Sequence, residues 1–161
     1  MNPTRFDAYK QFKFRVKWDG KYIPGIIKIS GLKRRTEVII NREGGEPNII
    51  RRSPGKTIYE PLILTRGRTH DTAFEEWANL VFTYGSSPEM SLKNFRKDIV
   101  IDLLNEAGQL VMSFLVYRCW PSEYNPLGEL ESNDTSVALE SITLQYEGMA
   151  RDTAVVEPKE P

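Results

Sequence analysis

The sequence is poor in the residues that enzyme and metal sites most often use. Its 161 residues include one cysteine, Cys119, and one histidine, His70. One cysteine excludes a disulfide within the chain, and one Cys with one His is too few for the usual zinc site. No apolar run approaches the roughly 18 residues of a membrane helix, and the N-terminal segment lacks the apolar stretch of a signal peptide. We therefore expect no metal, no cofactor, no membrane anchor, and a buried Cys119 thiol in a reducing cytosol.

Two motifs suggest chemistry, and both are weak. His70 precedes Asp71, and a His-Asp pair can orient a general base, but no nucleophile lies in a recognisable motif. Residues 55–57 (Gly-Lys-Thr) imitate the end of a phosphate loop. That loop requires an earlier glycine at the position that Ile50 occupies here, and a helix where this chain has the pattern of a strand. We therefore predict that the protein is not an enzyme.

The net charge is zero, but the charge is unevenly distributed along the chain. Residues 28–68 hold ten Lys and Arg against four acidic residues, a net of +6, while residues 121–161 hold two against nine, a net of −7. Opposite charges in two regions of one chain favour head-to-tail association, although both regions could equally be solvated surface. The length and the 40% hydrophobic content predict one soluble domain over 1–154, followed by a charged, Pro-rich tail over 155–161 that we expect to be disordered.

Apolar patterning predicts a mainly β protein with about seven strands. The expected strands cover 12–18, 22–29, 36–41, 56–65, 98–104, 109–120 and 136–147. Asp19-Gly20 predicts a hairpin turn, residues 53–55 (Ser-Pro-Gly) predict another turn, and residues 121–134 predict a loop. The apolar phase shifts between Leu139 and Ile142, which predicts a bulge.

One helix is predicted after residue 71. Thr72 and Glu75 have the spacing of a capping box, and Gly85 is the expected C-terminal stop. The apolar positions follow helical spacing and form one stripe: Phe74, Trp77, Ala78, Val81 and Phe82. We expect Phe74, Trp77 and Val81 to be helix core residues. The fold class is therefore an antiparallel β-barrel or sandwich with one flanking α-helix and an extended hairpin.

Several predicted strands are apolar on both faces. Residues 99–101, 110–112 and 114–116 are continuous apolar runs. Such strands need cover on both sides, and one helix of about three turns is too short to cover a whole sheet. Either the sheets cover each other or another subunit covers the remainder, and the second option predicts an oligomer.

The basic segment also admits a nucleic-acid interpretation. Small β-barrels bind nucleic acid, and residues 33–35 (Lys-Arg-Arg) with Arg51 and Arg52 could contact phosphates. Against this, Tyr59 is the one aromatic residue in the segment for base stacking, and the net charge of zero gives no long-range attraction to a polyanion. A monomeric β-barrel that binds a small ligand or single-stranded nucleic acid remains the alternative to an assembly subunit.

A set of motifs follows in a fixed order between residues 7 and 153. These are 30–34 (SGLKR), 36–38 (TEV), 42–45 (REGG), 52–57 (RSPGKT), 66–71 (RGRTHD), 74–75 (FE), 77–79 (WAN), 95–98 (FRKD), 105–109 (NEAGQ), 117–120 (YRCW) and 122–124 (SEY). In this set the chain resembles the tail-tube proteins of contractile phage tails and of extracellular contractile injection systems.

The resemblance implies a small β-barrel that forms six-membered rings, with the rings stacked into a hollow tube. It implies contact with copies of itself, with sheath and baseplate proteins, and with cargo or DNA in the lumen. It also implies assembly in the bacterial cytoplasm before incorporation into a virion or a released injection particle. A tube-initiating paralogue at the baseplate and a secreted ring protein of the type VI kind share much of this fold and remain alternatives.

The resemblance also implies an inter-subunit loop over residues 42–56 that reaches a neighbouring ring. Its implied contact and backbone-shaping residues are Arg42, Glu43, Gly44, Gly45, Ile49, Ile50, Arg51, Arg52, Gly55 and Lys56. An exposed Ile49-Ile50 pair is a liability in a monomer and reasonable when it is buried against a partner. The alternative is that the pair forms a local hairpin core within one subunit.

Overall fold

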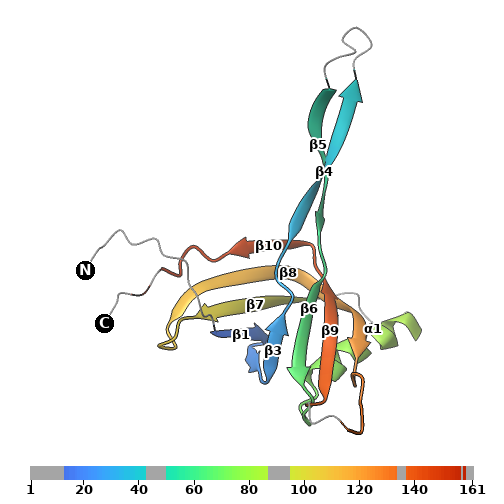
Figure 1. The fold of residues 1–161 in the computed structure, drawn as a ribbon, viewed down its shortest axis with the longest axis vertical. Helices are drawn as coiled ribbons and strands as arrows, with labels where there is room; N and C mark the ends of the chain where they lie inside the picture. Colours follow the sequence, from blue (N-terminus) through green and yellow to red (C-terminus); the bar gives the residue numbers. More distant parts are fainter. Residues whose placement is uncertain (1–12, 43–49, 87–94, 134–136, 157, 159–161) are drawn as a thin grey trace.

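The computed structural model describes residues 13–42, 50–86, 95–133, 137–156 and 158. In chain order the elements are β1 (Lys13–Trp18), β2 (Lys21–Ile23), β3 (Ile26–Ile29), β4 (Arg34–Arg42), β5 (Ile50–Tyr59), β6 (Leu62–Gly67), α1 (Ala73–Ser86), β7 (Lys97–Leu104), β8 (Leu110–Asn125), β9 (Leu139–Gln145) and β10 (Gly148–Arg151). Eight strands form one antiparallel sheet in the order β2-β1-β7-β8-β9-β6-β3, with β10 on β8, while β4 and β5 form a separate hairpin (Figure 1). The mainly β fold class with one helix is confirmed.

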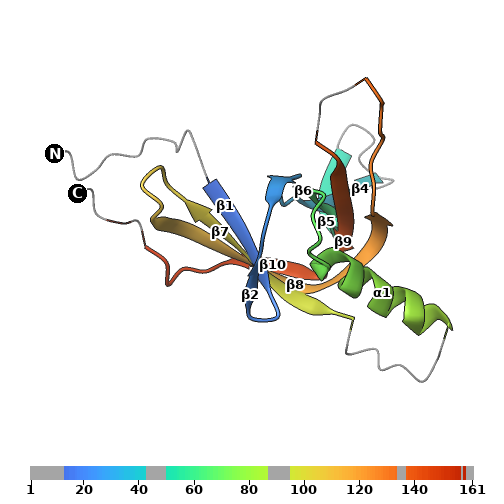
Figure 2. The same ribbon diagram turned by 90° about the horizontal axis from the view of Figure 1, so that it is seen from below.

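The long strand β8 belongs to both halves of the sheet. Its first part pairs with β7, and its last part, from Trp120 to Asn125, pairs with β9. Near the end of the part that pairs with β7, Arg118 has a φ of 55°, and its backbone N–H donates to Asp98 Oδ1 at 2.9 Å. The strand β8 bends along its length (Figure 1). Figure 2 shows β1 and β7 on one side of the bend and β6 and β9 on the other.

The core lies inside this bend, where α1 packs against β8. The rings of Trp18 and Trp77 lie 4.9 Å apart between centroids, and those of Trp18 and Phe74 lie 5.8 Å apart. Trp77 Nε1 also donates to the backbone oxygen of Phe95 at 2.6 Å, so the indole N–H is satisfied although the residue is 1% exposed. Phe74 and Trp77 are core residues, as predicted, and Val81 is half-buried.

The hairpin turn at Asp19-Gly20 is confirmed. Both residues have positive φ, 52° and 78°, which is the backbone of a type I′ turn. The second predicted strand, 22–29, is divided at Pro24-Gly25 into β2 and β3. The division moves the chain across the fold, because β2 pairs with β1 whereas β3 pairs with β6 at the other end of the strand order.

The turn predicted at 53–55 was wrong, and the strand predicted over 56–65 is divided into the end of β5 and the start of β6. Residues 53–55 lie within β5, and the chain instead breaks at Glu60-Pro61, before β6. Pro54 is tolerated there because β5 pairs with β4 alone, so one edge of β5 needs no ladder hydrogen bond. A register shift between Thr36 and Val38 absorbs the irregularity.

The predictions for the C-terminal strands were partly wrong. β8 continues to Asn125, so the first residues of the predicted 121–134 loop are in a strand, and the predicted last strand is split into β9 and β10. The predicted bulge is absent from the β6–β9 ladder, which runs in regular register from Leu62 opposite Leu144 to Gly67 opposite Leu139. The apolar phase shifts because Glu140, a charged residue, occupies a core-facing position in β9.

The helix begins where it was predicted to begin, but its details differ. The carboxylate of Asp71 accepts the backbone N–H of Ala73 at 2.9 Å, and the Thr72 hydroxyl pairs with Glu76 rather than with Glu75. The helix runs through Gly85 to Ser86, so Gly85 does not stop it. Phe82 is 77% exposed, which corrects its place on the buried stripe.

Candidate assembly surfaces

The hairpin of β4 and β5 projects from the body of the molecule (Figure 1). Its two strands pair with each other from Arg34 opposite Tyr59 to Arg42 opposite Ile50. At about 3.4 Å per residue, the nine residues of β4 span about 30 Å. The hydroxyls of Thr36 and Thr57 lie 3.1 Å apart across the ribbon and help to hold its register. The hairpin is therefore long relative to the body that carries it.

Large apolar side chains are exposed along this hairpin. Val38 is 63% exposed, Ile39 45%, Ile40 60% and Ile50 49%. The Ile39 side chain lies over Gly55 of the neighbouring strand, since a Cβ built on that glycine would be 3.1 Å from it. The other three side chains lie on the opposite face, since successive side chains of a strand alternate. Exposed β-branched residues on a two-stranded ribbon are typical of a surface that is covered by a partner.

The hairpin is also strongly basic. Over 34–42 and 50–59 it holds six basic residues and one acidic residue, Glu37, a net of +5. The basic residues are Arg34, Arg35, Arg42, Arg51, Arg52 and Lys56. Arg35 Nε lies 3.3 Å from Glu60 Oε1 at the base of the hairpin. Arg51, Arg52 and Lys56 are exposed further along β5.

The structure places the predicted loop residues as follows. Ile50, Arg51, Arg52, Gly55 and Lys56 all lie in β5, so a strand replaces the second half of the expected loop. Arg42 is the last residue of β4. Glu43, Gly44, Gly45 and Ile49 lie outside the described residues.

Sequence reasoning missed a buried charge cluster at the β6–β9 pair. Arg66 is 0% exposed and Glu140 is 1% exposed, and Arg66 Nε donates to Glu140 Oε1. Glu140 Oε2 also accepts from Arg68 Nη1 at 2.6 Å and from the Tyr124 hydroxyl at 3.2 Å. Two cations and a hydroxyl therefore surround one buried carboxylate. The signal was present in the sequence, because Arg66 continues the alternation of Leu62 and Leu64.

The same cluster attaches the helix to the sheet. The Arg66 guanidinium donates to Asp71 Oδ1 at 3.0 Å and to the Asp71 backbone oxygen at 2.7 Å, and it lies 4.3 Å from the centroid of the Phe74 ring. The Ala73 N–H and then Arg66 hold the pKa of Asp71 below its usual range. Burial, and then the charge of Glu140, raises the pKa of Tyr124.

A second polar cluster lies around Asp102 in β7. Asp102 is 4% exposed, and its carboxylate accepts from Arg15 Nε at 2.9 Å, from the Tyr22 hydroxyl at 3.1 Å and from Ser113 Oγ at 2.8 Å. Val100 shares this face of β7, because it lies two residues before Asp102, and it is half-buried. The apolar patterning of β7 thus coexists with a buried charge.

The described residues offer little for catalysis or metal binding. His70 is exposed, and the Asp71 carboxylate is engaged by Ala73 and Arg66. Burial raises the pKa of the Cys119 thiol to about 12, which disfavours the nucleophilic thiolate. Among the residues that the structure describes, no three His, Cys, Asp or Glu side chains are placed to hold a metal ion. Nor does the described part of the chain contain a helix long and apolar enough to cross a membrane.

Several solved structures share this fold. The chain matches a protein of the anti-feeding prophage tube-terminating cap with a TM-score of 0.75 and 22% identity, covering 95% of this chain and 96% of that one. It matches a chain of the PVC contractile injection system sheath-tube complex in the extended state with a TM-score of 0.72 and 23% identity, covering 90% and 91%. Hcp1 from Flavobacterium johnsoniae matches with a TM-score of 0.56 and 14% identity, covering 86% and 93%. These likenesses show that the chain shares the fold of these proteins.

The sequence itself identifies the family. Residues 10–150 match the family model described as T4-like virus tail tube protein gp19, and the chain belongs to that family. A comparison with curated proteins found no match. The family is one of structural tube proteins, so the chain is a structural protein and not an enzyme. The resemblance stated from the sequence motifs is confirmed.

Proposed function

We propose that this chain is the repeating subunit of the inner tube of a contractile tail or injection system. Six copies form a ring, rings stack head to tail into a hollow tube, and sheath contraction drives the tube through a target envelope. Sheath and baseplate proteins are its expected partners, which is supported by matches to chains from a sheath-tube complex and from a baseplate. Membership of the tail tube family supports the structural role.

The observation that carries this proposal is the exposed apolar and basic hairpin. Full burial of a Val or Ile side chain contributes about 1.5–3 kcal/mol, and roughly half of each of the four side chains remains to be covered. Covering them would therefore contribute on the order of 4 kcal/mol per subunit before the entropy cost of association. Repeated six times around a ring, such a contact would be cooperative. In this assignment Arg42, Glu43, Ile49, Ile50, Arg51, Arg52 and Lys56 contact the neighbouring ring, while Gly44, Gly45 and Gly55 shape the backbone.

Reversing the charges of two exposed side chains in the hairpin tests this proposal. The variant Arg51→Glu with Arg52→Glu should leave the fold intact, because both side chains are exposed on a ribbon away from the core. It should block the stacking of rings into tubes, as seen by negative-stain electron microscopy. The matched control, Arg51→Lys with Arg52→Lys, retains the charge and should stack.

Circular dichroism and thermal unfolding of both variants establish that the body is folded. If the charge-reversed variant forms tubes of the same length as the wild type at the same concentration, the hairpin is not the stacking contact. A local hairpin core within one subunit would then be the better explanation of the isoleucine residues.

A further inference from the structure

The surface farthest from the hairpin lies at the other end of the β6–β9 pair. The hairpin ends at Tyr59, and β6 begins close to it at Leu62, opposite Leu144. β6 ends at Gly67, opposite Leu139, about 17 Å further along the sheet at about 3.4 Å per residue. Figure 1 shows the hairpin at one extreme of the molecule and the loop between β8 and β9 at the other.

This loop is acidic and apolar over its described part, residues 126–133, which we name the acidic loop. It contains Glu129 and Glu131, both exposed, and no basic residue. Its leucines are exposed as well, Leu127 by 53% and Leu130 by 62%. The adjoining start of β9 adds two further exposed side chains, Val137 at 70% and Leu139 at 38%.

The acidic loop is held against the sheet. The Gly128 N–H donates to the Leu139 backbone oxygen at 2.8 Å, and a Cβ built on Gly128 would lie 3.3 Å from that oxygen. Arg68, a cation at the same end of β6, is engaged by the buried Glu140. The acidic loop is thus attached to β9 by a backbone hydrogen bond, and its two glutamate side chains are exposed to solvent.

The two ends of the molecule are complementary in charge and in apolar character. The hairpin has a net charge of +5 over 34–42 and 50–59, and the acidic loop has a net charge of −2 over 126–133. Each end also exposes four aliphatic side chains. Because the two surfaces lie at opposite ends, contact between them joins different copies of the chain and repeats along one direction.

We propose that the acidic loop, with Val137 and Leu139, is the surface that receives the hairpin of the next copy in a stack. This inference rests on the proposed tube function and assigns the second half of its stacking contact. The occupant is a second copy of this chain, since an acidic partner would be repelled by Glu129 and Glu131 and the chain itself carries the complementary basic ribbon.

A mixing experiment with two charge-reversed proteins tests this pairing. The loop variant is Glu129→Lys with Glu131→Lys, which changes the net charge of the loop from −2 to +2. The hairpin variant is Arg51→Glu with Arg52→Glu and Lys56→Glu, which changes the net charge of the hairpin from +5 to −1. Alone, each presents like charges at the contact, so the protein concentration needed for stacking should rise at least about tenfold. Mixed in equal amounts, each hairpin meets a loop of opposite charge, so tubes of alternating rings should form again.

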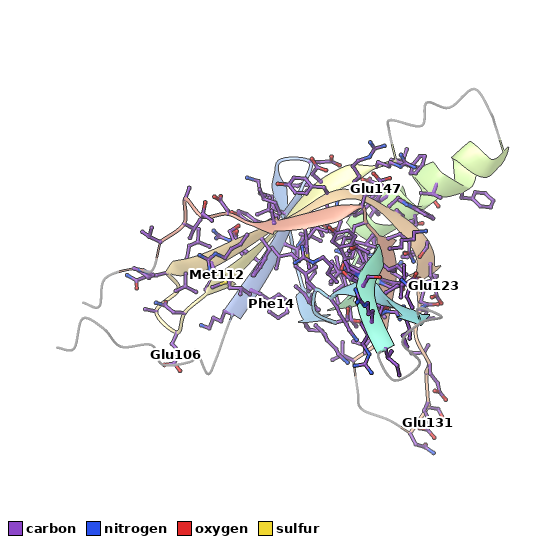
Figure 3. The ribbon with its side chains drawn as sticks, turned by 90° about the horizontal axis from the view of Figure 1, so that it is seen from above. Phe14, Glu106, Met112, Glu123, Glu131 and Glu147 are labelled. Carbon is purple, nitrogen blue, oxygen red and sulfur yellow. The ribbon has the colours of Figure 1, made fainter. Side chains whose placement is uncertain are left out.

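Two controls accompany the mixture. Glu106→Lys makes the same type of charge reversal in the turn between β7 and β8, away from Glu131 (Figure 3), and should stack at the wild-type concentration. Circular dichroism of each variant establishes folding. Tube length is measured by negative-stain electron microscopy, and the stacking concentration by light scattering.

The outcomes separate the inference from the proposed function. Restored tubes in the mixture, with neither variant stacking alone, support the pairing. Wild-type tubes together with a loop variant that stacks normally contradict the pairing and leave the tube function standing. A wild-type protein that stays monomeric at every concentration contradicts both.

Discussion

Removal of Glu140 should destabilise this fold far more than removal of an exposed glutamate. The Glu140 carboxylate is 1% exposed and accepts hydrogen bonds from Arg66, Arg68 and Tyr124. In Glu140→Ala the Arg66 guanidinium, itself 0% exposed, would keep Asp71 as a partner but lose the acceptor for its Nε–H. The loss thus leaves a buried cation partly unpaired.

The magnitude follows from the burial of both charges. Breaking a buried ion pair from one side costs about 3–5 kcal/mol, so we expect Glu140→Ala to lose about 4 kcal/mol of unfolding free energy. The unfolding free energy of a domain of this size is about 5–15 kcal/mol. If that of the wild type is near about 5 kcal/mol, Glu140→Ala should be close to unfolding in water. With a urea slope of about 2 kcal/mol per molar, the midpoint should fall by about 2 M.

The assay is urea denaturation of the dilute protein, followed by the fluorescence of Trp18 and Trp77 in the core. The matched control is Glu147→Ala, because Glu147 is half exposed and pairs with Arg118 at 3.0 Å on the surface. That control should cost under about 1 kcal/mol. Arg66→Met combined with Glu140→Leu removes both charges and should recover most of the loss. If Glu140→Ala and Glu147→Ala are equally stable, the buried cluster does not have the role assigned to it.

Three further predictions concern single features. The pKa of Asp71 is lowered in the fold by the Ala73 N–H and Arg66, so the ionised carboxylate stabilises the fold above its unfolded pKa, and this stabilisation is lost as pH falls through the lower folded pKa. The melting temperature of the wild type should therefore drop more steeply in acid than that of Asp71→Asn. Parallel curves of melting temperature against pH would contradict this. The Cys119 thiol, with a pKa raised to about 12, should resist iodoacetamide at pH 8 in the folded protein and react fully in urea, as read by mass spectrometry. Val38→Thr with Ile40→Thr should change the unfolding free energy by under about 0.5 kcal/mol but hinder stacking, and normal stacking would show that these side chains are not covered.

The elements that sequence patterning predicted well are those that local interactions determine. The Asp19-Gly20 turn was predictable because its positive φ values suit those two residues. Phe74 and Trp77 were predictable as core because helical spacing places them on one stripe. The position of the hairpin was also predictable. Its aliphatic residues are exposed in the single chain, which is unusual for a monomer and typical of a surface that a partner covers.

The elements that were mispredicted depend on partners distant in sequence. Pro54 appeared to mark a turn. It lies instead in a two-stranded ribbon, where each strand has one unpaired edge, so the N–H that proline lacks is not needed for a ladder hydrogen bond. Glu140 appeared to break the apolar phase of its strand, because its partner Arg66 is 74 residues away and the pairing exists only after β6 and β9 meet. The residues of the acidic loop did not predict that the loop lies at the end of the molecule farthest from the hairpin. That position depends on how all the strands of the sheet are arranged.

Electron microscopy of the purified wild-type protein at high concentration, with light scattering on the same sample, tests the central claim most directly. The account predicts six-fold rings with an open centre, and end-to-end stacks of these rings as concentration rises. Particles that remain monomeric at every concentration would contradict it.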